Sequence, residues 1–425
     1  MKQLKHPAGS GNRSLTDVCV ARQPIFGTMG EVAGYELLYR RSPSDKAAGT
    51  SVSRNAMGAD GIVHAFLNVG LEGLTTGRAA YVNFTREMLL VGAYTPLPAE
   101  HVVIELLAEV EPDDDVETAC EQLVDAGYAL ALDDFAGGAE FGRLLELATV
   151  VKVDVLDVPA KRLDEIAQQL APYDVRLLAE RVETANVRAT CAGLGYELFQ
   201  GYFFAQPEVV AGRALVSDDL AIAQAINVLR DPNASDSDAE AVIGTDVGLS
   251  YRLLRMVNSA AGGGREIESI RHAVQLTGRN ELAKCLALLL VSSIAGRRAA
   301  HRELLHLALQ RARLCELLAA TAGLGRDGNA SFLVGLVSLL DAIAGIPTTD
   351  LLESIALAPP IRAALVERTG PYAGPLTLAE AYERGEWTAV VREASSLGLD
   401  VSQVGELYVQ SLAWTRARLL SLTAG

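Results

Sequence analysis

The sequence Val150-Val151-Lys152-Val153-Asp154-Val155 is a short, mostly apolar run, typical of a strand buried on both faces. Seven more runs of this kind lie between residues 18 and 203. In chain order the eight are Val18–Ile25, Val32–Tyr39, Ala80–Phe84, Val102–Leu107, Ala129–Asp133, Val150–Val155, Val175–Glu180 and Leu198–Phe203. The last six begin at intervals of roughly 20–27 residues, the length of one strand, one helix and two short loops.

Helical patterns fill the intervals between these runs. Asp114–Ala126 and Pro159–Ala171 both place their apolar residues on one helical face. Eight buried strands alternating with helices predict an α/β domain, a (β/α)8 barrel of the TIM type. The alternative is an open, doubly wound sheet, but no GxGxxG or GxxxxGK[ST] loop follows any of the strands.

After residue 215 the strand-like alternation stops and helical periodicity takes over. Long apolar-faced helices are expected at Leu282–Ala295, Glu303–Ala322, Ala330–Ala344 and Val401–Leu422. The second half is therefore predicted to be all-helical. We expect a disordered tail at residues 1–15, the barrel at 16–212 and the helical domain at 219–425.

The chain of 425 residues is acidic, with 37 Lys and Arg against 53 Asp and Glu and a net charge of −16. This balance argues against electrostatic binding of nucleic acid or of an anionic membrane surface. Five single cysteines without paired spacing indicate a reducing compartment. No secretory signal and no run long enough to span a bilayer is present, so a cytoplasmic location is expected.

Polar residues lie at the predicted carboxyl ends of the strands, where barrels of this type place their chemistry. They are Glu36, Asn83, Glu105, Asp133 with Asp134, Lys152 with Asp154, Glu180 and Gln200. One acid at a strand end is usually a helix cap, but this many around one barrel indicate a functional mouth.

Converging carboxylates repel one another unless cations lie among them. Hard oxygen ligands suit Mg²⁺ or Mn²⁺, and two such ions can clamp a phosphodiester. Lys152 could orient a water molecule, and Arg40 could hold a phosphate oxygen. The residues alone leave phosphoester hydrolysis and enolase-type proton abstraction both open.

Several stretches resemble the EAL domain family of cyclic-di-GMP phosphodiesterases, and they occur in family order over residues 17–210. They are Gln23-Pro24-Ile25, Tyr35-Glu36-Leu37-Leu38-Tyr39-Arg40, Val82-Asn83-Phe84, Ile104-Glu105-Leu106, Leu132-Asp133-Asp134-Phe135, Val151-Lys152-Val153-Asp154, Leu178-Ala179-Glu180-Arg181-Val182-Glu183-Thr184 and Gln200-Gly201-Tyr202-Phe203-Phe204.

This resemblance implies a reaction that opens cyclic-di-GMP to linear pGpG with two ions of Mg²⁺ or Mn²⁺. It implies Lys152 and Glu180 as catalytic residues and Arg40 and Gln200 as ligand contacts. The implied metal ligands are Glu36, Asn83, Glu105, Asp133, Asp134 and Glu180.

The chain also departs from the family pattern. The signature triplet has Leu37 in place of alanine, and Ala136-Gly137-Gly138 replaces the family's Gly-Thr-Gly after Phe135. Ala108 replaces an acid, Arg181 replaces a glycine, and the stretch between Arg40 and Asn83 is short. These changes support a second hypothesis, a barrel that binds cyclic-di-GMP without turnover or acts as a scaffold through protein contacts.

The helical half resembles the HDOD domain, an all-helical relative of HD phosphohydrolases. The matching stretches are Leu229-Arg230-Asp231-Pro232-Asn233-Ala234, Leu253-Leu254-Arg255-Met256-Val257-Asn258-Ser259 and Ile267-Glu268-Ser269-Ile270-Arg271-His272-Ala273-Val274. The order of the two halves is similar to that of bacterial signalling proteins of the YuxH type.

Where an HD hydrolase needs adjacent His and Asp, this chain has Ser338 and Leu339. No metal and no catalysis are therefore expected in the helical half. Its expected role is to bind an unidentified protein partner or a second copy of the chain, as a homodimer.

Overall fold

The computed structural model describes residues 18–41, 71–138, 140–205, 217–260, 269–295, 301–324, 328–344, 346 and 357–423. Eight strands close into a barrel in chain order, β1 to β8. Their bounds are β1 Val18–Phe26, β2 Val32–Arg41, β3 Ala79–Phe84, β4 Val102–Leu106, β5 Ala129–Leu132, β6 Val150–Asp154, β7 Arg176–Glu180 and β8 Leu198–Gln200. The predicted barrel is confirmed, and each strand lies within two residues of its predicted run except β8, which ends three residues earlier than predicted.

The first strand departs from a regular (β/α)8 barrel. β1 pairs antiparallel with both β2 and β8, whereas β2 to β8 pair in parallel. β1 and β2 pair along their whole length, but β8 pairs only with Ile25 and Phe26 of β1. The start of β1, residues 18–21, pairs with residues 38–41 of β2, which have no partner in β3, so this two-stranded ribbon extends past the barrel at the carboxyl ends of the strands.

Short helices follow the parallel strands. They are α2 Leu71–Thr75, α3 Arg86–Leu90, α4 Asp114–Asp125, α5 Gly142–Leu147, α6 Ala160–Leu170 and α7 Ala185–Gly193. Asp113 caps α4 by accepting a hydrogen bond from the Val116 amide at 3.0 Å, and α4 buries Val116 and Leu123 against the barrel. The two helices predicted in this half, at 114–126 and 159–171, are confirmed as α4 and α6.

The helical half continues from residue 217. Its helices include α8 Ser217–Arg230, α9 Asp236–Gly244, α10 Val247–Ala260, α11 Ile270–Thr277, α12 Arg279–Ala295, α13 His301–Thr321, α14 Gly328–Val337, the short α15 Leu340–Ala344, α18 Ala373–Glu383, α19 Trp387–Ser396 and α20 Val401–Thr423. The single helix predicted at 330–344 is wrong. It is interrupted after Val337, where the Ser338 hydroxyl donates to the Gly335 carbonyl at 2.7 Å and accepts from Arg311.

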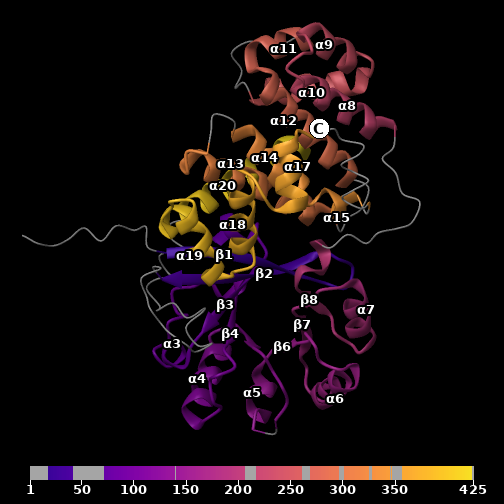
Figure 1. Cartoon of the computed structure of the whole chain (residues 1–425). Helices are drawn as coiled ribbons and strands as arrows, with labels where there is room; N and C mark the ends of the chain where they lie inside the picture. The colour runs from indigo at the N-terminus through magenta and orange to yellow at the C-terminus, as the bar shows by residue number, and fades with distance from the viewer. Residues whose placement is uncertain are drawn as a thin grey trace, which may run out of the picture.

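The helical half rests on the β1–β2 ribbon, with α18, α19 and α20 next to β1 and α8 to α11 at the far end (Figure 1). Tyr382 of α18 donates to the Val20 carbonyl at 3.2 Å, and Cys19 of β1 donates to the Val401 carbonyl at 3.5 Å. A Cβ atom at Gly405 would lie 3.1 Å from the Cys19 sulfur, so α20 approaches the strand closely. The apolar face of α20 is thus core.

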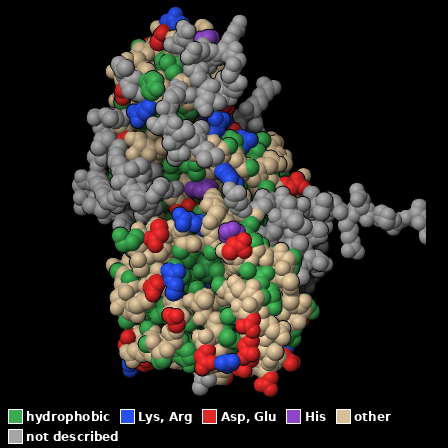
Figure 2. Space-filling view, turned by 180° about the vertical axis from the view of Figure 1, so that it is seen from behind, with side chains coloured by type: hydrophobic (Ala, Val, Ile, Leu, Met, Phe, Trp, Pro, Cys, Tyr) green, Lys and Arg blue, Asp and Glu red, His purple; other side chains and the backbone are tan. Residues whose placement is uncertain are grey.

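Acidic side chains gather at the barrel end of the face shown in Figure 2, in keeping with the net charge. Among the helices that the structure describes, none is long and apolar enough to cross a membrane. The predicted tail, residues 1–15, lies outside the described residues, as does most of the predicted boundary between the two halves.

Candidate functional site

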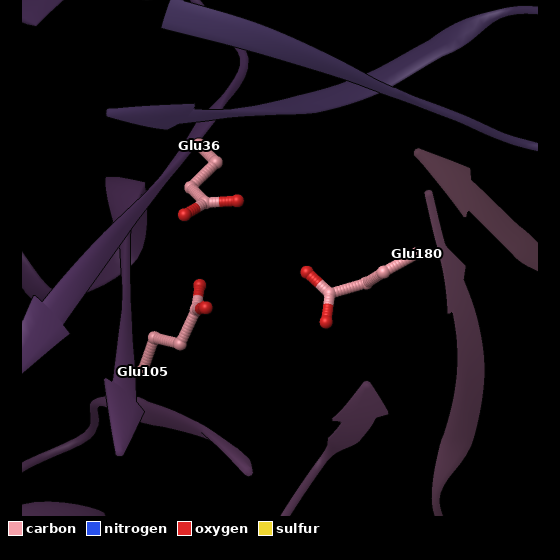
Figure 3. Close-up of side chains that lie close together, drawn as sticks. All are labelled: Glu36, Glu105 and Glu180. Atoms are coloured by element: carbon pink, nitrogen blue, oxygen red, sulfur yellow. The ribbon is translucent and has the colours of Figure 1, made fainter. Parts of the chain in front are cut away.

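Acidic side chains from separate strands converge at the mouth of the barrel. Glu36 of β2, Glu105 of β4 and Glu180 of β7 point toward one centre (Figure 3). One carboxylate oxygen from each lies within 4.8 Å of the others. Asp133 and Asp134, directly after β5, form a second group of this kind with Glu180. Parallel strands with staggered ends bring together acids that lie up to 144 residues apart in sequence.

Lys152 of β6 lies at the centre of this acid cluster and is 1 % exposed. Its ammonium nitrogen lies 2.7 Å from Glu180, 3.2 Å from Asp133 and 3.3 Å from Glu36. It also donates a hydrogen bond to Glu105. One ammonium group therefore faces four carboxylates with only three N–H donors, so the cluster retains excess negative charge.

Two amide side chains fix the orientation of Glu36. Asn83 of β3 donates to one carboxylate oxygen at 3.1 Å, and Gln200 of β8 donates to the other at 2.6 Å. Gln200 also donates to the side-chain oxygen of Gln23 at 3.0 Å. Gln23 and Glu36 are direct partners across β1 and β2, so this network spans the closure of the barrel.

Three buried oxygen atoms of the site have no hydrogen-bond partner among the described residues. They belong to Asn83, Glu105 and Gln200. A buried acceptor without a donor is costly, and a divalent cation satisfies such oxygens directly. The unpaired oxygens and the excess negative charge together fit hard cations such as Mg²⁺ or Mn²⁺.

Burial raises the pKa of Glu105 well above its usual range, and the neighbouring acids add to this while Lys152 opposes it. Burial likewise raises the pKa of Glu180, again against the effect of Lys152. Burial opposes the charge of Lys152, but the surrounding carboxylates raise the pKa of its ammonium group above the usual value. Without other cations, the cluster therefore tends to hold protons.

Two non-glycine residues at the mouth have left-handed backbone, Asp134 with φ 46° and Arg181 with φ 54°. This conformation costs about 1–3 kcal/mol for such residues and is often found at functional sites. The positive φ at 181 explains why glycine suits the position. Arg181 instead directs its guanidinium to Asp154, at 3.1 Å, so its charge lies at the rim of the mouth.

The altered loop after Phe135 is fixed from outside the barrel. Arg162 of α6 donates to the Ala136 carbonyl at 2.6 Å, and Gln169 of α6 donates to the Gly138 carbonyl at 3.1 Å. The loop therefore has partners on the adjacent helix, next to Asp133 and Asp134.

The helical half contributes to the cavity above the acid cluster, which sequence reasoning missed. A cavity of about 700 Å³ is lined by the site acids and also by residues from α13, from the turn between α18 and α19, and from α20. These residues include Glu303, Gln310, Arg384, Glu386 and Tyr408. No sequence signal marks them, because their role depends on how the two halves dock.

Seven of the predicted site residues lie together at the mouth, and Gln200 joins them. They are Glu36, Asn83, Glu105, Asp133, Asp134, Lys152 and Glu180. Arg40 lies in β2 opposite Cys19, and its side chain lies outside the described part of the structure. The roles of all these residues as metal ligands, catalysts and ligand contacts stay predictions.

In the helical half, Ser338 stands where an HD hydrolase has its His-Asp pair, and it contacts a buried arginine. Arg311 of α13 donates to Ser338 at 3.0 Å and binds the Glu383 carboxylate with two nitrogens. The Nη2 atom, one of the two nitrogens that bind Glu383, also donates to the Tyr202 hydroxyl at 2.6 Å, which joins α13 to the segment after β8.

Comparison with known proteins agrees with this arrangement. Residues 60–207 match the model of the EAL domain, and residues 219–350 match that of the HDOD domain. A Vibrio cholerae protein named cyclic di-GMP phosphodiesterase CdgJ is 31 % identical over 405 residues, which is 93 % of this chain and 92 % of CdgJ. The chain belongs to the EAL–HDOD family. The uncharacterized protein YuxH of Bacillus subtilis is 30 % identical over 407 residues, covering 93 % of this chain and 98 % of YuxH.

Solved EAL structures resemble part of this EAL–HDOD protein. The Bacillus subtilis YkuI protein, solved with cyclic-di-GMP and calcium, is 16 % identical and covers 55 % of this chain and 72 % of its own, with a TM-score of 0.37. In this chain, Glu36 precedes the matched EAL segment, and α18 to α20 follow the matched HDOD segment.

Proposed function

We propose that this EAL–HDOD protein acts in cyclic-di-GMP signalling, with a barrel that binds cyclic-di-GMP and hydrolyses one of its phosphodiesters to give pGpG. The single observation that carries this proposal is the buried acid cluster around Lys152, in which one ammonium group faces four carboxylates. The name of the relative CdgJ, which matches along nearly its whole length, supports the same substrate.

The donor set of the site fits two divalent ions, Mg²⁺ or Mn²⁺. The residues that would hold them are Glu36, Asn83, Glu105, Asp133, Asp134 and Glu180. When bound, such ions lower the pKa of a water molecule and neutralise charge on a phosphoryl group.

The residues of the chain then have defined tasks. Lys152 orients the attacking water and stabilises negative charge on the phosphoryl oxygens. Glu180, whose carboxylate lies 2.7 Å from the Lys152 nitrogen, takes up the proton of that water. The water oxygen forms a bond to phosphorus, one ester P–O bond of the ring breaks, and the leaving oxygen receives a proton. Gln200 and Arg40 contact the ligand.

The direct test uses the full chain, cyclic-di-GMP and Mn²⁺, with separation of the products. We expect metal-dependent pGpG from the unchanged protein and a loss of about 100-fold or more in Glu180→Ala and Lys152→Ala. Glu197→Ala is the matched control, because Glu197 pairs with Arg176 on the surface away from the mouth. Equal activity in all these variants would contradict the proposal.

A second candidate is a receptor without turnover, which the altered loop Ala136-Gly137-Gly138 and the cation Arg181 favour. The loop adjoins two of the proposed metal ligands, and Arg181 supplies a positive charge at the rim. Calorimetry with cyclic-di-GMP and Ca²⁺ separates the cases. Binding without pGpG would mean a receptor, and neither binding nor turnover would mean a scaffold.

The proposal assigns no catalysis to the HDOD half, which would bind a protein partner or a second copy of the chain. It also retains a cytoplasmic location and no nucleic-acid ligand. The net charge of −16 supports the last point.

A further inference from the structure

The turn between α18 and α19 reaches the mouth of the barrel and is held there by specific contacts. The backbone carbonyl of Arg384 accepts a hydrogen bond from the side chain of Gln23 at 3.1 Å. Gly385 has φ 66°, and a Cβ atom there would lie 2.5 Å from the Leu38 side chain. Glycine therefore allows the turn to pack tightly against the β1–β2 ribbon.

This turn is joined to the acid cluster through side chains. Gln23, which donates to the Arg384 carbonyl, accepts a hydrogen bond from Gln200, and Gln200 donates to Glu36 at 2.6 Å. The turn is therefore three hydrogen bonds away from a proposed metal ligand. It lies beyond the residues that match the HDOD model.

Arg384 brings a guanidinium group to the wall of the cavity. Its partner is Glu386, with nitrogen to oxygen distances of 2.7 and 3.3 Å. The Arg384 side chain is 36 % exposed and that of Glu386 is 50 % exposed. Such an exposed pair contributes little to stability, so Arg384 can exchange Glu386 for a better anion at low cost.

A second observation also points to a ligand in this cavity. The side-chain nitrogen of Gln310, on α13, makes no hydrogen bond of regular geometry within the described part of the chain, although the Tyr408 hydroxyl lies near it, and Gln310 is only 2 % exposed. It lines the same cavity as Arg384 and the acids. A buried donor without an acceptor costs free energy that an acceptor on a ligand would recover.

We propose that the helical half forms the second wall of the nucleotide site, with Arg384 binding a phosphate of the cyclic dinucleotide and Gln310 donating to an acceptor on it. This inference rests on the proposed function. The ligand carries two phosphates, and a mouth rich in acids needs further cations to hold such a dianion. A planar guanidinium binds phosphate oxygens with two parallel hydrogen bonds, and the cavity of about 700 Å³ has the size of a small-molecule site.

The test is calorimetric titration of the full chain with cyclic-di-GMP in Ca²⁺. Arg384→Ala is expected to raise the Kd about tenfold or more, because it removes charge-assisted hydrogen bonds to the ligand. Gln310→Leu is expected to raise the Kd to a smaller extent. Arg392→Ala is the matched control, because Arg392 lies on α19, is 69 % exposed and pairs with its neighbour Glu393.

Glu386→Gln should change the Kd in the opposite direction to Arg384→Ala. It removes the anion that competes for Arg384, so the Kd should fall. In the Arg384→Ala background the same substitution should have no such effect, which separates release of Arg384 from a general change of charge. Thermal unfolding of each variant shows whether the fold is retained.

The outcomes separate the two claims. If the unchanged protein binds and Arg384→Ala binds equally tightly, the inference is wrong and the proposed function stands. If Glu386→Gln tightens binding equally in both backgrounds, Arg384 is not the group that it releases, and the inference is again wrong. If the unchanged protein does not bind cyclic-di-GMP, the proposed function and the inference fail together.

Discussion

The barrel and the helical half each bury a cluster of charged side chains, but the two clusters differ in charge balance. In the helical half, buried Arg311 binds Glu383 and Glu380, and Arg368, whose side chain is 48 % exposed, pairs with Glu380 from the rim, so two positive charges meet two negative ones. Arg311 also bonds Tyr202 and Ser338, which leaves its nitrogens paired. This cluster is complete in itself.

The acid cluster of the barrel is not complete. Lys152 alone faces four carboxylates, and three nearby oxygens lack donors within the described residues. Buried charges that are paired tie elements together, whereas a buried excess of one sign calls for a ligand of the other. This difference in charge balance supports the proposed cation and phosphate chemistry in the barrel and a structural role for the cluster around Arg311.

Removal of Lys152 should give the largest effect. Lys152→Met leaves four buried carboxylates without a cation, and we expect a loss of about 5 kcal/mol of unfolding free energy in metal-free buffer. Because Mn²⁺ can replace the lost charge, saturating Mn²⁺ should restore most of this stability. Denaturant unfolding with and without Mn²⁺ measures both effects.

Lys161→Met is the control for that comparison, since Lys161 is 89 % exposed on α6. Its unfolding should be unchanged in either buffer. If Lys152→Met were as stable as the unchanged chain in metal-free buffer, the acid cluster would not depend on a cation and the two clusters would not differ.

Removal of Arg311 should have a somewhat smaller effect that metal does not reverse. Arg311→Met leaves Glu383 buried without its partner, and we expect a loss of about 3 kcal/mol. Mn²⁺ should restore none of it, because the helical cluster offers no site built for a cation. The same unfolding series measures this, with Arg392→Met as the control, because the Arg392 side chain is 69 % exposed. If Mn²⁺ restored the stability of Arg311→Met, the two clusters would not differ in their need for a cation.

A pH effect at the contact between the halves should be the smallest over the range from pH 6.5 to 5.5, at about 1.4 kcal/mol or less. Burial lowers the pKa of His306 to about 3, helped by the charge of Arg22. Arg22 donates to the Nε2 atom of His306 at 2.9 Å, so the imidazole is neutral, with its hydrogen on Nδ1 toward Glu303. In the unfolded chain the same imidazole has a pKa of about 6.5.

Between pH 6.5 and about 3 the unfolded chain therefore binds a proton that the folded chain excludes. The stability from neutral His306 is present above pH 6.5 and is lost as the pH falls, at up to about 1.4 kcal/mol per pH unit. Glu303, whose pKa burial raises, faces the same cluster and contributes a slope of its own, so the quantity to measure is the difference between the unchanged chain and His306→Gln. That difference should depend on pH below 6.5, and a difference that stays constant between pH 6.5 and 4.5 would contradict this account of His306.

Sequence reasoning found most of the barrel and most of its site, for a physical reason. Strands buried on both faces are continuous apolar runs, and polar residues at their carboxyl ends must share one mouth. Lys152 and Glu180 could thus be placed together from their strands alone. The antiparallel direction of β1 was missed because the apolar pattern of a strand is the same in both directions.

The contribution of the helical half could not be found in this way. Arg384, Gln310 and Glu303 lie on helices whose periodicity shows which face is buried but not what covers it. Their position over the mouth depends on contacts such as that between His306 and Arg22, which are 284 residues apart. The break at Ser338 was also missed, because a hydroxyl bonded to a buried arginine is a tertiary effect.

Titration of the metal-free full chain with Mn²⁺ in a calorimeter tests the central claim most directly, because it measures whether the acid cluster takes up divalent cations. The account predicts saturable binding by the unchanged protein and loss of that binding in Glu105→Gln, with Glu197→Gln unchanged. No binding by the unchanged protein, or equal binding by it and Glu105→Gln, would contradict the account.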